Sequence, residues 1–257
     1  MKNLTLFSWI LMLGTPVVLM GCNTLAQQKP VLDPDLESKV LQIIKNNPQV
    51  IFDSLQAYQK EQQDKLKQAQ QKILQQMQTN PQSLIGDSPT KGSIDQKIIL
   101  FEFADFQCPF CQKVSPTVKE FLAKNPEVAL VYKHLPLVQI HEQAIPAALA
   151  SWAAQQQGKF WEYHDALYQN QKDLGEATYL KIAQDLKLDL DKFNKDRASS
   201  VAKTAIQNDT ELAEKIGLQG TPAFFLNGVS LTGAQPLAAF EAALAQAKQL
   251  KPAAKKP

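Results

Sequence analysis

Two cysteines separated by two residues end an apolar run of the sequence. Cys108 and Cys111 follow the run LFEFADFQ and enclose Pro109 and Phe110. Proline suits the first position of a helix, where an N–H group has no partner within the helix. The sulfur of Cys108 would then face the positive end of that helix, which lowers a thiol pKa from about 8.5 to between about 3.5 and 7.5. We therefore predict that Cys108 is the nucleophile and that Cys111 resolves the mixed disulfide.

The cysteine pair has two other uses that the residues leave open. Two thiolates supply half of a tetrahedral metal site. The three histidines, His134, His141 and His164, show no paired spacing, so the metal alternative is copper(I) on the two thiols alone. A structural disulfide across two residues closes too small a loop to restrict the unfolded chain much. The redox use is favoured over both, and we interpret His134 and His141 as structural.

The composition indicates a globular protein and argues against a nucleic-acid-binding one. Of the 257 residues, 44% are hydrophobic and 20% are charged, so the chain can bury a substantial core. The formal net charge is +2, and the lysines are spread along the chain. A nucleic-acid groove has little electrostatic basis in such a sequence, and we predict no nucleic-acid partner. We predict no bound metal and no cofactor beyond a redox-active disulfide between Cys108 and Cys111.

The N-terminal residues indicate export. A lysine precedes the apolar run at residues 4–20, and the tetrapeptide LMGC ends at Cys22. The run is shorter than the roughly 20 residues of a membrane-spanning helix, so we predict a signal peptide at 1–21. The LMGC end resembles a bacterial lipobox, which implies a lipid on Cys22 that anchors the chain in the cell envelope. A linker at 22–34 follows.

The segment 35–78 is predicted to be helical, with a break at Asn47 because Pro48 disfavours helical geometry before it. From Ile51 to Met77 mostly apolar residues recur at spacings of three and four in a polar sequence. A narrow apolar stripe of this kind favours association with other copies of the chain. The alternative is a helix that lies on its own catalytic domain.

Strands and helices alternate in the part that contains the cysteines. Predicted strands at 97–105 and 128–137 flank a predicted helix at 109–124, which implies a right-handed parallel crossover. Asn227-Gly228 predicts a tight hairpin between two short strands. The other predicted segments are a linker at 79–93, an all-helical insertion at about 138–218, a closing helix at 238–250 and an unpacked tail at 251–257.

Several stretches resemble one protein family. FEFADFQCPFC, a helical insertion that contains QGKFWEYHDALY, and GTPAFFLNG occur in this order. They resemble the DsbA-like thiol-disulfide oxidoreductases of the thioredoxin superfamily over about 94–250. The resemblance implies an α/β, thioredoxin-like fold with an inserted all-helical domain and an N-terminal helical extension. That extension resembles the oligomerisation segment of disulfide isomerases of the suppressor-of-copper-sensitivity C type.

The family resemblance implies roles for further residues. Pro222 would form a cis peptide bond beside the cysteines, and Thr221 would pair its backbone with a bound substrate segment. An ordinary turn proline is the alternative. Glu102 matches the buried acid that exchanges protons with the inner cysteine, and burial on a strand would raise its pKa. A glutamate that points to solvent is the alternative for Glu102.

These residues together predict a lipid-anchored envelope oxidoreductase that exchanges disulfides with exported proteins. We place Pro109 and Phe110 with Thr221 among the residues that contact the substrate. A membrane redox partner would keep the pair oxidised in an oxidase, or reduced in an isomerase or reductase, and the sequence leaves this choice open. The rival function is a non-catalytic lipoprotein that binds copper or holds client segments in the same cleft.

Overall fold

The structure is a computed structural model that describes residues 34–92 and 98–250. Four predictions fall on other residues. The signal peptide, the lipid on Cys22, all but the last residue of the linker after it, and the tail at 251–257 lie outside the described residues. Within the described ranges, no helix has the length and apolar character needed to cross a bilayer.

The chain divides into two compact units after Ala57. The described part of the first unit contains helix α1, Pro34–Asn46, and the start of helix α2, Pro48–Thr79. The helices are separated at Asn47, as predicted, because the proline that follows disfavours helical geometry there. Apart from Asn47, all described residues of this unit are helical.

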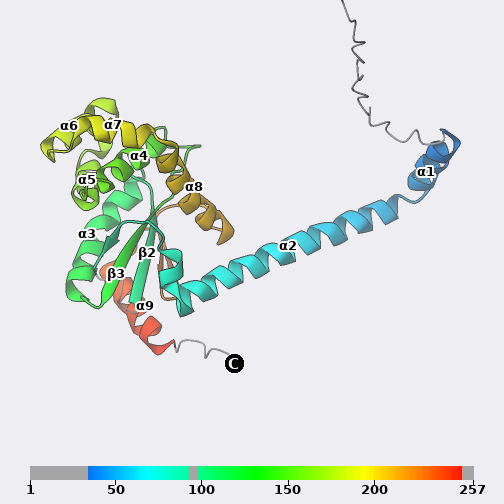
Figure 1. Cartoon of the computed structure of the whole chain (residues 1–257). Helices are drawn as coiled ribbons and strands as arrows, with labels where there is room; N and C mark the ends of the chain where they lie inside the picture. The colour runs from blue at the N-terminus through cyan, green and yellow to red at the C-terminus, as the bar shows by residue number, and fades with distance from the viewer. Residues whose placement is uncertain (1–33, 93–97, 251–257) are drawn as a thin grey trace, which may run out of the picture. The chain divides into compact units, whose positions relative to one another are not determined.

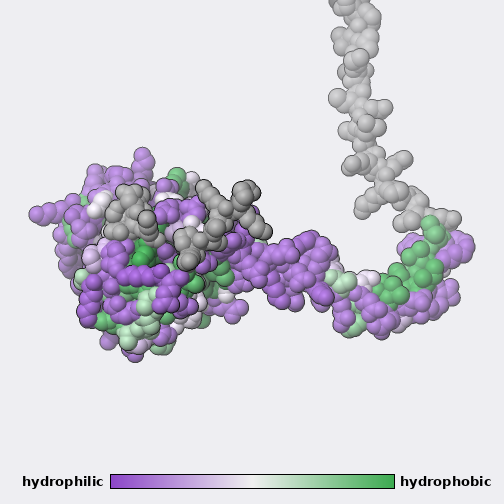
Figure 2. Space-filling model, turned by 90° about the horizontal axis from the view of Figure 1, so that it is seen from below, coloured by the Kyte–Doolittle hydropathy of each residue, from purple (hydrophilic) through white to green (hydrophobic). Residues whose placement is uncertain are grey.

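Helix α1 and the start of α2 expose many apolar side chains. Figure 2 shows hydrophobic surface over α1. Soluble proteins seldom leave so many large apolar residues in contact with water unless another surface covers them. The exposed large apolar residues of this unit are Leu36, Val40, Leu41, Ile43, Ile44, Val50, Ile51, Phe52 and Leu55.

The second unit is built on a mixed sheet with the strand order β1-β3-β2-β4-β5. Only β2 and β3 are parallel to each other, and the other neighbours are antiparallel. The predicted crossover is therefore present, with helix α3 between the two parallel strands. The strands are β1 Thr90–Lys91, β2 Ile98–Ala104, β3 Val128–His134, β4 Ala223–Leu226 and β5 Val229–Thr232.

Helices cover both faces of the sheet. Helices α3, Pro109–Lys124, and α9, Leu237–Gln249, pack on one face through Phe121 and Phe240, whose ring centroids are 5.5 Å apart. The other face packs against the C-terminal end of α2, where Met77 is fully buried, and against the end of α8. The central strand β2 is thus buried on both sides, which explains its nearly continuous run of apolar residues.

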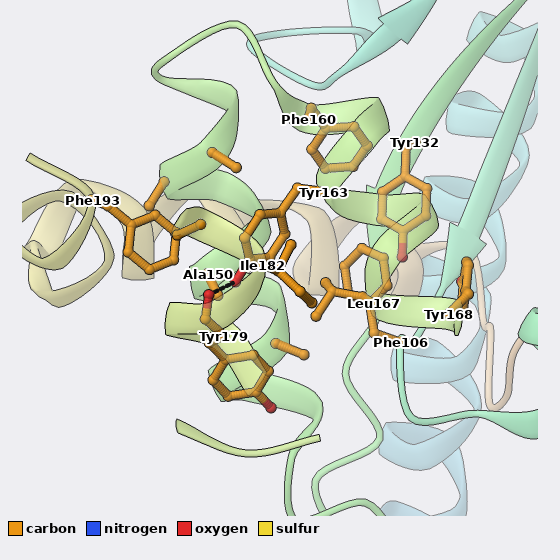
Figure 3. Close-up of a cluster of buried hydrophobic side chains, with 14 of the residues drawn as sticks. Phe106, Tyr132, Ala150, Phe160, Tyr163, Leu167, Tyr168, Tyr179, Ile182 and Phe193 are labelled. Carbon is orange, nitrogen blue, oxygen red and sulfur yellow. Dashed lines mark hydrogen bonds between the residues drawn. The ribbon is translucent and has the colours of Figure 1, made fainter. Parts of the chain in front are cut away.

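The predicted helical insertion follows β3 and gathers beyond one end of the sheet (Figure 1). Its core contains Tyr163, Tyr179 and Phe193, and the Tyr163 hydroxyl donates to the Tyr179 carbonyl oxygen at 3.0 Å (Figure 3). The same cluster includes both cysteines. The helices are α4 Ala144–Gln155, α5 Phe160–Gln169, α6 Glu176–Asp185, α7 Leu190–Ala198 and α8 Ser200–Lys215.

Two predicted segments differ from the structure. The strand predicted at 128–137 ends at His134, because its partner β2 ends at Ala104 and Pro136 has no N–H to donate. The segment predicted as a linker at 79–93 contains a short 3-10 helix and the edge strand β1, which pairs with β3. A strand of two residues is too short to show an alternating pattern in the sequence.

Candidate active site

The two cysteines stand at the start of α3, directly after the central strand. Cys108 is the residue before the first turn, and Pro109 occupies the first helical position, as predicted. The carbonyl oxygen of Cys108 accepts the N–H groups of Cys111 and Gln112 at 3.1 and 3.2 Å. Both thiols are free and buried. The N-terminal end of α3 therefore lies next to the sulfur of Cys108.

The two thiols have opposite acidities. A hydrogen bond from the Cys111 thiol is the largest of the effects that lower the pKa of Cys108 to about 5. Burial opposes this shift, while Thr221 and the backbone N–H groups of Phe110 and Cys111 add to it. The pKa of Cys111 is raised well above the usual range of a thiol, first by burial and then by the adjacent Cys108. At neutral pH, Cys108 is a thiolate and Cys111 keeps its proton.

The loop before β4 faces the outer cysteine. The Thr221-Pro222 peptide bond is cis, as predicted. The sulfur of Cys108 lies 3.4 Å from the carbonyl oxygen of Thr221, to which the thiol form donates. The loop is thus brought to the cysteine pair by the antiparallel pairing of β4 with β2.

Glu102 lies on β2 with only 2% of its surface exposed. Burial raises its pKa to about 8, and among the described residues no side chain hydrogen-bonds its carboxyl group. The predicted buried position and raised pKa are confirmed, and the solvent-facing alternative is wrong. Burial also raises the pKa of Tyr132 and Tyr168, and charge on Cys111 and on Glu102 raises both further. The carboxyl group therefore lies in a buried polar region behind the cysteines.

Apolar side chains are exposed around the cysteine pair. Pro109 is exposed, and Phe110 is 58% exposed. The loop after β3 adds Val138 and Ile140, which are 55% and 72% exposed. The sequence analysis missed these two residues, because nothing in a loop sequence shows which part of the chain it will lie against.

Asp105 holds that loop next to the cysteines. Its carboxylate accepts the backbone N–H groups of Gln107 at 2.8 Å and Leu137 at 2.9 Å, and it lies 2.7 Å from Nδ1 of His141. The backbone N–H of Gln143 donates to the side-chain oxygen of Gln107 at 2.6 Å. These bonds fix the loop after β3, which carries Val138 and Ile140, to the loop that directly precedes Cys108.

Gln171 ties the helical insertion to the reactive loop. Its side-chain nitrogen donates to the carbonyl oxygens of Phe106 at 2.8 Å and Cys108 at 3.0 Å. A separation of 63 residues between Gln171 and Cys108 hides this contact from sequence reasoning. The insertion therefore helps to set the geometry of the first turn of α3.

The described residues hold no group of three or more histidine, cysteine or acidic side chains placed to bind a metal ion. The reactive groups that the structure brings together are the two thiols, the buried acid and the Thr221-Pro222 loop. Such an arrangement can stabilise one thiolate, shield a second thiol and receive its proton.

The match to a family model covers residues 99–245, and the family is the DsbA-like thioredoxin domain. The chain belongs to this family. Its members are thiol-disulfide oxidoreductases, which agrees with the cysteine pair and the strand order. The predicted thioredoxin-like α/β fold with inserted helices is confirmed.

Proteins of two kinds are similar in sequence to the chain. The chain is 30% identical over 148 residues to the probable disulfide bond formation protein D of Bacillus anthracis, covering 53% of this chain and 68% of that protein. It is 38% identical over 157 residues to the Na+/H+ antiporter NhaA 3 of Salinispora tropica, covering 61% of this chain and 24% of the antiporter. The chain thus spans about a quarter of the length of the antiporters that it matches.

Solved structures share the fold. Proteus mirabilis ScsC in a transitional conformation has a TM-score of 0.61 at 24% identity, covering 84% of this chain and 97% of that chain. A thioredoxin-like oxidoreductase from Silicibacter pomeroyi has a TM-score of 0.58 at 27% identity, covering 64% of this chain and 94% of that chain.

Replacing Gln171 with Glu should raise the pKa of Cys108. A carboxylate in place of the amide removes two donated hydrogen bonds, faces two carbonyl oxygens and adds negative charge near the thiolate. Titration of the thiolate by its ultraviolet absorbance measures the shift. Gln169→Glu adds the same charge at an exposed position without these bonds and should shift the pKa much less. Equal titrations of Gln171→Glu and the unmodified chain would contradict the positioning role.

Proposed function

We propose that the chain catalyses thiol-disulfide exchange with other proteins through Cys108 and Cys111. The observation that carries this proposal is the opposite acidity of the two thiols at the start of α3. A thiolate with a low pKa is both present at neutral pH and a good leaving group. A buried partner thiol that keeps its proton does not compete for the substrate.

The exchange proceeds in two balanced steps. The Cys108 thiolate attacks a client disulfide, a new S–S bond joins Cys108 to the client, and the other client sulfur leaves as a thiolate. Cys111 then gives its proton to ionised Glu102 and attacks the sulfur of Cys108. The client leaves with both sulfurs reduced, and a Cys108–Cys111 disulfide forms. The reverse sequence oxidises a client dithiol.

The direction of net transfer depends on the redox partner of the chain. The lowered pKa of Cys108 stabilises the reduced pair, which makes the Cys108–Cys111 disulfide an effective oxidant. A partner that keeps the pair reduced would instead support isomerase or reductase work, because the same thiolate then starts each cycle. We propose that this partner is a membrane protein.

Clients would bind next to the sulfur of Cys108. An extended client segment can pair with the backbone of Thr221, whose carbonyl oxygen lies beside that sulfur. The exposed side chains of Phe110, Val138 and Ile140 supply apolar contacts. This surface is suited to unfolded or partly folded proteins, which expose apolar segments.

The site of action that we propose is the bacterial cell envelope. The predicted signal peptide and the lipid on Cys22 support export and anchoring, and exported proteins are the class of protein that carries disulfides. The clients would then be exported proteins with thiols or disulfides.

Trapping the mixed disulfide tests the proposed exchange. Cys111→Ser should accumulate a covalent complex with a client through Cys108, because the resolving thiol is absent. Cys108→Ser should form none, since Cys111 is buried and keeps its proton. Nonreducing gel analysis after acid quench and alkylation measures both. Complex formation by Cys108→Ser, or client holding by a double-serine variant as strong as that of the unmodified chain, would contradict the exchange mechanism.

We also propose that the chain self-associates through the exposed apolar residues of α1 and the start of α2. Replacing Ile51 and Leu55 with glutamate should convert the assembly to a monomer, because charges would be buried in the contact. Light scattering measures the mass. Gln56→Glu, at an exposed polar position on the same helix, should keep the assembly. A monomeric mass for the unmodified chain would contradict the proposal.

A further inference from the structure

A narrow crevice between β1, β2, β3, α3 and α5 reaches Glu102. Its volume is about 10 Å³, close to the minimum that one water molecule needs. Two exposed lysines, Lys91 and Lys119, lie at its walls together with the buried Glu102. The remaining lining residues are Ser115, Val118, Leu122, Leu130, Trp161 and His164.

His164, which also lines this crevice, has one ring nitrogen without a hydrogen bond among the described residues. It is only 4% exposed, its Nδ1 lies 2.9 Å from Oδ1 of Asp165, and its Nε2 is buried without a partner among the described residues. Because a carboxylate only accepts hydrogen bonds, Nδ1 carries the proton and Nε2 presents a lone pair. The imidazole ring is surrounded at centroid distances of 4.8 to 5.9 Å by Phe106, Tyr132, Phe160, Trp161 and Tyr168.

The charged groups around His164 act in both directions on a positive charge of its ring: Asp165 favours that charge, while Lys119 and Lys91 oppose it. Asp165 remains ionised because, against the effect of burial, hydrogen bonds to His164 and Lys119 lower its pKa to about 2. Its second carboxylate oxygen lies 2.7 Å from Nζ of Lys119. Burial lowers the pKa of His164 itself, so the resting imidazole is neutral. Lys91 stands farther out, with Nζ 5.5 Å from the Trp161 ring.

The proposed exchange requires a proton route to this position. Burial raises the pKa of Glu102 to about 8, so most of the molecules carry a protonated Glu102 at pH 7. A protonated acid cannot take the proton of Cys111. The hydroxyl groups of Tyr132 and Tyr168, whose pKa values burial raises, stay protonated and provide no base.

We propose that His164 relays protons between Glu102 and solvent through the water-sized crevice that both residues line. This inference rests on the proposed function, because it supplies the base for its second step. The Glu102 acid loses its proton through one water molecule to Nε2 of His164, which leaves a carboxylate and an imidazolium bonded to Asp165. The imidazolium then loses the proton to solvent between the two lysines. His164 acts through Glu102 and does not touch the reacting sulfurs.

The proposed relay gives a function to the motif QGKFWEYHDALY, which contains His164. QGKFWEYHDALY places the histidine and Asp165 next to each other on α5, and Trp161 one turn earlier closes the same crevice. The inserted helices therefore contribute to the second step as well as to the geometry of the reactive loop.

Rapid mixing of the full chain with a fluorescent disulfide peptide tests the relay. The reduced chain forms the mixed disulfide, and the later release of peptide from Cys108 reports the second step. In the unmodified chain this release should follow a single phase, because Glu102 exchanges protons quickly. In His164→Phe the release should split in two. The fast phase should be a minority of the amplitude at pH 7 and should grow as the pH rises through about 8, following ionisation of Glu102.

Two controls separate a relay from a structural role. His134→Phe replaces another buried histidine of the same aromatic cluster that does not line the crevice, and should keep the single phase. Glu102→Gln should give one slow phase at every pH. The first step should be unaffected in all three variants, since Cys108 is already a thiolate.

The outcomes distinguish the relay from the proposed function. A single phase in His164→Phe with the pH dependence of the unmodified chain would overturn the relay while leaving the exchange intact. If His164→Phe does not fold, Asp165→Asn decides, since the relay predicts the same split phases and a structural role predicts one phase. An unmodified chain that forms no mixed disulfide would instead overturn the proposed function.

Discussion

The thiolate of Cys108 at the start of α3 is the interaction on which the rest of the site depends. The helix supplies backbone N–H groups beneath the sulfur, and the thiol of Cys111 donates to it. This thiolate can form only because Cys111, one turn inside the helix, is too buried to ionise. The negative charge of the Cys108 thiolate is thus stabilised, while burial prevents a second negative charge on Cys111.

The fold serves this separation of charge. The central strand β2 is covered on both faces, and the turn after it places the cysteines at the end of the sheet. Cys111 lies on the buried side of this position, and Cys108 lies on the side where we propose that clients bind. The antiparallel pairing of β4 with β2 brings the Thr221 carbonyl oxygen beside Cys108. The inserted helices close the buried side, where Gln171 fixes the carbonyl oxygen of Cys108. The insertion is therefore part of the active site as well as a cover over it.

Sequence reasoning succeeded where the cause is local. Pro109 marks the start of α3, the Asn227-Gly228 turn gives the hairpin, and an acidic residue within an apolar strand indicates a buried carboxyl group at Glu102. The predicted length of the second strand was wrong. The apolar run in the sequence continues past Pro136, which has no backbone N–H to donate to a neighbouring strand.

The sequence could not show contacts between distant segments. Gln171 and Ile140 are ordinary residues in the sequence; the packing of the insertion brings Gln171 to Cys108, and the bonds of Asp105 hold the loop that carries Ile140. The strand β1 has too few residues to leave a pattern. The sequence shows His164 only as one of three histidines, because the crevice that it lines with Glu102 forms only when α5 packs against β2 and α3.

The most direct test of this account is the titration of each thiol by its rate of alkylation, with the modified residue identified by mass spectrometry. The account predicts that Cys108 reacts with a midpoint at about pH 5 and that Cys111 stays unreactive throughout the neutral range. Because the pKa of Cys108 in the fold is below the value of about 8.5 in an unfolded chain, its thiolate stabilises the reduced protein. That contribution is complete above about pH 8.5 and is lost as the pH falls through about 5. Two thiols that both titrate near 8.5 would contradict the account.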